Sequence, residues 1–343
     1  MFSEVDVQMN KMLVAETGNM YPSIAYFHTL LRSSQEMKES TLTEQLYFAD
    51  CPGLMDTTNV ADGNYGLFQR PGLTKGSNTF EVAGPMLGDC PMFDRYLFNG
   101  VKLDICLKRS SPTFCLMSSE DQPLASDNYS VVTEGAFLRL YKLKINPSVL
   151  VAHSKLLHSD VTAKYPYTKR DVKYCTVPPN LSSFSWSHIC QNLTPSTVVV
   201  AFCLSEAVAG SYKKNPWHFI NCDVKQLPLC VNGISTPGDP IHVDYSMDNK
   251  GGKVLQVFDG YLDTLNNINV GIARAYVGRG YAIYVFYMEP SFSENTKFPP
   301  VKSYELYLIV RFGTPLQESA RCVIYTEKVG LLEFDKTRNI KIN

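Results

Sequence analysis

Apolar and polar residues alternate with a period of two along several short stretches of the chain. Every second position from Leu306 to Phe312 is Leu, Val or Phe, and residues 101–108 show the same alternation. This period is typical of a strand with one buried face, because successive side chains of a strand point to opposite faces. Loops rich in Pro, Gly, Ser and Asn separate the stretches, which favours a sandwich or barrel. Strands are expected at 101–108, 137–145, 198–202, 281–288, 305–312 and 322–325.

Helical periodicity is confined to a few short segments. Residues 21–31 place apolar side chains such as Ile24 and Phe27 on one helical face, and residues 254–265 show a similar spacing. A third helix is expected over residues 147–157, which begin with a proline suited to the first helical position. Short helices between many strands indicate an all-β protein.

Two segments far apart in the sequence share one order of elements. Residues 5–14 read as strand, polar turn and strand, with Asn10-Lys11 at the turn, and the helix of residues 21–31 follows. Residues 227–235 repeat this order around Asn232-Gly233, before the helix expected at 254–265. The distance exceeds two hundred residues, far beyond the repeats of solenoid proteins. The pattern predicts two copies of one β domain, joined near residues 146–166.

Composition agrees with two domains and narrows the class of partners. A chain of 343 residues suggests about two domains, and 45% hydrophobic residues suffice for two cores. The aromatic share of 12% and the many Val and Ile favour strands. The formal net charge is −1, with basic residues spread evenly, so direct nucleic-acid binding is not predicted.

The sequence predicts an intracellular, reduced protein. It begins without a basic-then-apolar signal peptide, and no apolar run approaches the ~18 residues that a membrane span needs. None of the ten cysteines forms a CxxC pair, so they are expected to be free thiols used as small hydrophobic side chains.

No arrangement of residues predicts catalysis, a cofactor or a metal ion. His153 and His158 are five residues apart, a spacing poor for one helix face, and the pair His188 and Cys190 is more often packing than a site. Residues 248–253 precede a helix but lack the first glycine and the hydroxyl residue of a phosphate loop. There is no G-x-S-x-G nucleophile motif. No catalytic, cofactor-binding or metal-binding residue is therefore expected, and an enzyme is the least favoured class of protein.

From end to end, the chain resembles the major capsid (hexon) protein of Polinton/Maverick elements and the related adintoviruses. The stretches that carry the resemblance are EVDVQMNKMLV (4–14), YPSIAYFHTLL (21–31), DRYLFNGVKLDICLKRS (94–110), FCLMSS (114–119), KINPSVLVAHSKLL (144–157), AKYPYTKRDVKY (163–174), AGSYKKNPWHF (209–219), GYAIYVFYMEPSFS (280–293) and FDKTRNI (334–340).

The resemblance implies a double jelly roll, in which residues 1–145 form the first jelly roll and residues 146–343 the second. Three chains would form a pseudo-hexagonal homotrimer that tiles an icosahedral shell beside neighbouring capsomers and a minor capsid (penton) protein. Such a protein resides in the virion after synthesis inside a cell. Family members have a leading segment ahead of the strand found here after Met1, so the first jelly roll is expected to lack its earliest strands.

The interface residues are an open question at the level of sequence. Aromatic loops at 164–167 and 212–219 are candidates for contacts between copies, with Trp217 either an anchor or buried under its own jelly roll. The alternative function is a host-domesticated binding module on the same fold. Symmetric trimers favour the capsid hypothesis, and a stable monomer with a ligand favours the module.

Overall fold

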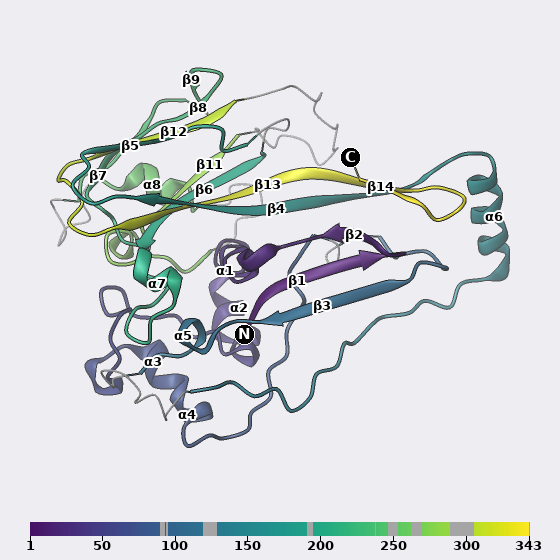
Figure 1. Cartoon of the computed structure of the whole chain (residues 1–343), viewed down its shortest axis with the longest axis horizontal. Coiled ribbons are helices and arrows are strands. Elements are labelled where there is room, and N and C mark those ends of the chain that lie inside the picture. The colour runs from purple at the N-terminus through teal and green to yellow at the C-terminus, as the bar shows by residue number, and fades with distance from the viewer. Residues whose placement is uncertain are drawn as a thin grey trace.

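The computed structural model describes residues 1–89, 93, 95–118, 129–190, 195–236, 238–245, 253–261, 269–288 and 305–342 (Figure 1). Three antiparallel sheets dominate this part of the chain, and the helices between them are short. The strands are β1 (Phe2–Met9), β2 (Met12–Ala15), β3 (Leu103–Arg109), β4 (Ala163–Val177), β5 (Ser183–Trp186), β6 (Thr197–Leu204), β7 (Val224–Leu227), β8 (Leu229–Val231), β9 (Ile234–Ser235), β10 (Ile241–His242), β11 (Ile283–Tyr287), β12 (Leu306–Phe312), β13 (Ala320–Phe334) and β14 (Ile340–Ile342).

The helices lie in the connections. The α-helices are α1 (Tyr21–Arg32), α2 (Gln35–Glu39), α3 (Tyr65–Gln69), α4 (Pro71–Thr74), α5 (Pro112–Cys115), α6 (Pro147–His158), α7 (Ser205–Ala209) and α8 (Leu255–Asp259), and the 3-10 helices are η1 (Gly18–Met20), η2 (Thr41–Gln45), η3 (Val60–Asp62) and η5 (Arg274–Tyr276). The predicted helices at 21–31 and 147–157 are confirmed. The one expected at 254–265 is wrong in length, since α8 ends at Asp259; residues 262–268 are not described.

Strands β4 to β13 form a two-sheet sandwich with the strand order of a jelly roll. One sheet has the order β4-β13-β6-β11. The other has the order β5-β12-β7-β10, and β8 continues β7 along the same edge of β12 after Pro228. Each sheet alternates early and late strands of the chain, as in an eight-stranded jelly roll. The predicted all-β fold class is therefore confirmed. We call this unit the sandwich.

The sandwich core follows the period-two pattern of the sequence. Leu306, Leu308 and Val310 on β12 are almost fully buried, whereas Arg311 is exposed. Strand β6 is buried on both faces over most of its length. The other sheet covers one face, and helix α1 lies against the opposite face at the start of the strand. The strands predicted at 101–108, 198–202, 281–288, 305–312 and 322–325 are confirmed as β3, β6, β11, β12 and β13.

The amino-terminal sheet has the order β2-β1-β3 and repeats a motif of the sandwich. Strand β1 pairs with β2 through a hairpin and with β3 on its other edge, just as β8 pairs with β9 and β12. Asn10 and Asn232 both adopt positive φ at the hairpin turn, at 51° and 49°. Asn10 donates its N–H to the Lys102 carbonyl (2.9 Å) and accepts the Lys102 N–H on its side chain (2.8 Å).

The second hairpin repeats that clamp atom for atom. Asn232 donates its N–H to the Glu305 carbonyl (3.0 Å), and its side-chain oxygen accepts the Glu305 N–H (3.0 Å). An asparagine suits both roles, because it tolerates the left-handed conformation and its short amide reaches the neighbouring backbone. The repeated order of elements predicted from the sequence is therefore present in the three-dimensional structure, down to individual hydrogen bonds.

Two long strands join the amino-terminal sheet to the sandwich. Strands β4 and β13 pair in register over fifteen residues, and their far ends extend past the sandwich to lie over β1 and β2 (Figure 1). A second core forms there, made of residues from both units: Val7, Met9, Val14, Ala15, Tyr165, Tyr167, Leu332 and Phe334. The two halves of the chain therefore share buried apolar surface.

One predicted strand does not form. Residues 137–145 are extended but belong to no sheet, and their side chains are exposed. No backbone group from 132 to 145 pairs with another backbone group of the described chain. A strand requires a neighbour for its N–H and C=O groups, and the sequence pattern cannot tell whether that neighbour is present.

Candidate functional site

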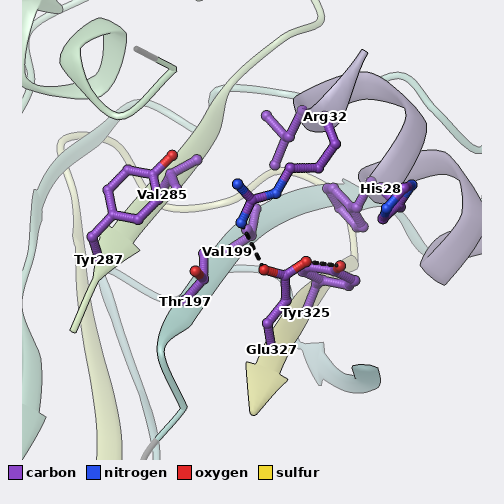
Figure 2. Close-up of a pocket in the computed structure, with 10 residues that line it drawn as sticks. His28, Arg32, Thr197, Val199, Val285, Tyr287, Tyr325 and Glu327 are labelled. Atoms are coloured by element: carbon purple, nitrogen blue, oxygen red, sulfur yellow. Dashed lines mark hydrogen bonds and ion pairs between the residues drawn. The ribbon is translucent and has the colours of Figure 1, made fainter. Parts of the chain in front are cut away.

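A shallow hollow lies between helix α1 and the sandwich, and several polar side chains line it. It is small and partly open to solvent. Its lining residues are Phe27, His28, Leu31, Arg32, Thr197, Val199, Val285, Tyr287, Tyr325 and Glu327. Figure 2 shows Arg32 of α1 reaching across the hollow to Glu327 of β13, with His28 beside the helix.

The carboxylate of Glu327 is the centre of this group. It accepts a hydrogen bond from Arg32 Nη2 at 2.8 Å and another from the Tyr325 hydroxyl at 2.6 Å. Arg170 Nε adds a second positive charge at 3.6 Å. Burial raises the pKa of Glu327, but the two guanidinium groups and the Tyr325 hydroxyl outweigh it, so the pKa lies below its ordinary value. Glu327 is therefore an ionised, fully paired carboxylate.

Two neighbouring side chains, His28 and Tyr325, are held in their neutral forms. Burial, aided by the positive charge of Arg170, lowers the pKa of His28 to about 4, so the imidazole is neutral near pH 7. Burial likewise raises the pKa of Tyr325 well above 10. Among the described lining residues there is no serine or cysteine that a base could activate. The ion pair between Arg32 and Glu327 therefore fixes α1, in the first half of the chain, to the sandwich in the second half.

A second polar network fastens the 50–70 region to the loop at 212–219. Asp56 accepts hydrogen bonds from the Asn215 N–H (2.9 Å) and lies 2.8 Å from the His218 ring. Asp50 accepts from Asn215 Nδ2 at 3.1 Å and pairs with Arg70. Burial opposes ionisation of Asp56, but its bonds to His218 and Asn215 outweigh this and lower its pKa. These contacts are directed inward and position the loop.

The main aromatic side chains of the two segments considered as contact surfaces pack against the chain's own elements. Trp217 stacks on Tyr26 of α1 with ring centroids 4.3 Å apart and meets Phe114 edge-on at 5.8 Å. Residues 164–167 are part of β4 instead of a loop, and Tyr165 and Tyr167 are buried against the amino-terminal sheet. The expectation of a loop is therefore wrong for 164–167, whereas 212–219 is a loop that is mostly half-buried, with Lys213 exposed.

Of the two weakly suggestive motifs of the sequence, only the His188–Cys190 pair lies wholly among the described residues, and it does not form a site there. His188 is exposed and faces Glu305 at 3.4 Å, whereas Cys190 is buried, so the pair does not share one face. No group of three or more His, Cys, Asp or Glu residues in the described ranges could hold a metal ion. In the run 248–253, residues 248–252 lie outside the described residues. No described helix has the length and apolarity needed to cross a bilayer.

The most unusual surface lies on residues 131–158, which we call the arm. The arm consists of the extended segment 131–146 and helix α6, and Figure 1 shows it as a long trace that ends at α6. Helix α6 packs only weakly against the rest of the chain, since Leu157 is its one buried residue. The large apolar side chains of the arm that are at least one-third exposed are Val132, Phe137, Leu138, Leu140, Tyr141, Leu143, Ile145, Val149, Leu150, Val151 and Leu156.

Known proteins similar to this chain were found by sequence and by structure. No family model matches. An uncharacterized protein of Caenorhabditis elegans is 22% identical over 339 residues, which cover 97% of this chain and 77% of that protein. The quasi-atomic model of the PBCV-1 virus capsid matches with a TM-score of 0.42 and 9% identity, over 99% of this chain and 83% of the capsid chain.

Two further solved structures are similar. PBCV-1 VP54, fitted into a cryo-EM reconstruction of the virophage Sputnik, has a TM-score of 0.39 at 8% identity, with 99% of this chain and 83% of that chain covered. The mavirus major capsid protein has a TM-score of 0.29 at 11% identity, with 55% and 43% covered. Similarity at this level does not establish a shared function, which has to be argued from the chain itself.

Proposed function

We propose that the chain is a structural capsid protein that forms trimeric capsomers of an icosahedral shell. The observation that carries the proposal is the repeated hairpin clamp at Asn10 and Asn232, together with the jelly-roll order of the sandwich. Jelly rolls are recurrent in viral capsids. Two such units in one chain would place six around the axis of a trimer, which gives a pseudo-hexagonal outline suited to tiling.

In this proposal residues 1–145 and 146–343 are the two jelly-roll domains. The end-to-end sequence resemblance supports a Polinton/Maverick or adintovirus lineage for the capsid protein. The partners are two further copies of the chain, neighbouring capsomers and a minor penton protein. The protein has a structural, non-enzymatic role in the virion after assembly inside a cell, without direct binding to nucleic acid.

Mass and shape in solution test the proposal. Size-exclusion chromatography with light scattering should give three times the mass of the chain, and negative-stain electron microscopy should show particles with a six-cornered outline. A stable monomer at every concentration tested, with a bound ligand, would instead support the host-domesticated binding module. Dimers or tetramers without the six-cornered outline would contradict the capsomer.

A further inference from the structure

The arm, residues 131–158, exposes more apolar surface than a free protein normally carries. Phe137 and Tyr141 are 80% and 92% exposed, and nine other large apolar side chains of the arm are at least one-third exposed. At about 150–200 Å² for each fully exposed side chain, the total is roughly 1,000 Å². The largest apolar patch on a typical monomer is about 300–600 Å², and one side of a standard interface is about 800 Å². The area is enough for one side of a stable interface.

The repeat within the chain indicates what the extended part of the arm is. Strand β3 is the counterpart of β12, because each pairs with the first strand of its clamped hairpin. The next strand after β12 is β13, which lies between two neighbours in its sheet. The corresponding segment after β3 is the arm, whose backbone from 132 to 145 pairs with no other backbone group of the described chain. Within the described ranges, this part of the arm is thus a strand-like sequence that pairs with no other strand.

The charge on the arm selects among the surfaces that could cover it. Arg139, Lys142 and Lys144 are exposed and interleave with the apolar side chains, against one acidic residue, Glu134. Antiparallel pairing of two arms would bring these cations together, and like charges on neighbouring strands are destabilising. The charge therefore disfavours a self-complementary contact between two arms and favours an acidic covering surface.

The chain itself carries such a surface. The first 89 residues contain eleven acidic and five basic side chains. Within them, Glu36 and Glu39 on α2 and Glu44 on η2 are exposed, and Met37, also on α2, is 46% exposed. These four residues, which we call the α2 face, lie on the adjoining elements α2 and η2. They combine one exposed apolar side chain with three negative charges, which complement the three cations of the arm.

We propose that the arm of one copy docks on the α2 face of a second copy. The contact is heterologous, since different surfaces of the two copies meet, and heterologous contacts close into rings when the rotation allows. The inference rests on the proposed function, because it assigns the contact that closes the trimeric ring. It names a basic, apolar strand segment as the donor and an acidic face on the next copy as the acceptor.

A charge-swap experiment on the full chain tests this assignment. The variants are Lys142→Glu with Lys144→Glu on the arm, Glu36→Lys with Glu39→Lys on the α2 face, and all four together. Each pair alone should weaken assembly at least tenfold by light scattering at graded dilutions, and the combined variant should restore it. A matched control is Lys253→Glu with Lys328→Glu on the sandwich, which should assemble like the unmodified chain. Loss of assembly in both pairs without restoration in the combined variant would overturn the pairing.

Hydrogen exchange of the arm separates this inference from the capsomer proposal. Protection of residues 131–145 should rise with protein concentration and fall in the Lys142→Glu, Lys144→Glu variant. Trimers whose arm exchanges rapidly would overturn the arm contact and leave the capsomer intact. A protected arm in an oligomer other than a trimer would support the contact and contradict the capsomer. Protection independent of concentration would mean that the chain covers its own arm, which overturns docking on a second copy.

Discussion

Replacement of Glu327 by Gln should loosen helix α1 from the sandwich and lower the stability of the whole chain. The change keeps the shape of the side chain and removes its negative charge. Arg32 Nη2 and Arg170 Nε lie 2.8 and 3.6 Å from the Glu327 carboxylate in the unmodified chain. In the variant both positive charges remain beside a buried position that no longer carries a negative charge. Breaking a buried ion pair by removing one partner costs about 3–5 kcal/mol.

The lower end of that range is expected here. The amide of Gln can still accept a hydrogen bond from the Tyr325 hydroxyl, and the side chain of Arg32 is 33% exposed, so water can partly solvate its charge. A loss of about 3 kcal/mol corresponds to a fall of roughly 6–12 °C in melting temperature for a domain of this size. Differential scanning fluorimetry resolves such a change.

The exposed carboxylate of Glu318 offers a matched control. Glu318→Gln removes the same charge from the surface and should change stability by less than about 0.5 kcal/mol. If Glu327→Gln lowers the melting temperature by less than about 2 °C, the ion pair is not the joint between α1 and the sandwich.

The pH dependence of stability gives an independent check on Glu327. Its folded pKa lies below the unfolded value of about 4.3, so the folded state favours the ionised form. The resulting stabilisation is complete above the unfolded pKa and is lost as the pH falls through the folded pKa. The difference in melting temperature between the unmodified chain and Glu327→Gln should therefore shrink on acidification below about pH 4. A difference that stays constant down to the acid transition would contradict the electrostatic origin.

Three further predictions concern the core and the cysteines. Leu308→Asp should abolish soluble expression, because it places an unpaired charge in the sandwich core, whereas Tyr307→Ser on the opposite face should be mild; equal tolerance would show that the strand is wrongly oriented. Lys38→Met should cost about 2–4 kcal/mol in urea unfolding, because the buried ammonium donates to the Leu30 and Val270 carbonyls and both would lose their partner; an unchanged midpoint would refute this. All ten cysteines should titrate as free thiols in denaturant, and two or more disulfides by mass spectrometry would contradict the reduced state.

The sequence predicts the parts of the fold that depend on local patterns. The alternation around Leu308 identifies β12 and its buried face, and the turn residues Asn10 and Asn232 identify both hairpins. These features follow from the two-residue period of a strand and from backbone conformations that few residues adopt. The sequence alone does not predict that each asparagine bonds to the backbone of a distant residue, Lys102 or Glu305. The usable signal is an asparagine at the same turn position in both hairpins.

The sequence does not predict features that depend on which elements become neighbours. Residues 137–145 have the composition of a strand, but whether they pair depends on a second strand that a one-dimensional pattern does not specify. The sequence makes Trp217 a candidate anchor for a partner, but in the structure Trp217 stacks on Tyr26 of α1. The Glu327 group was missed because its members, Arg32, Arg170 and Tyr325, are spread over nearly three hundred residues.

The fifteen-residue pairing of β4 with β13 has a mechanical consequence. A force applied along these strands loads their hydrogen bonds in shear, so many bonds have to break together before the strands slide. Because the same two strands belong to the sandwich and also pack on the amino-terminal sheet, bending between the halves would have to curve a continuous two-stranded ribbon. A hinge between the amino-terminal sheet and the sandwich is therefore unfavourable. Under a load from neighbouring molecules, the two halves should move together as one rigid body.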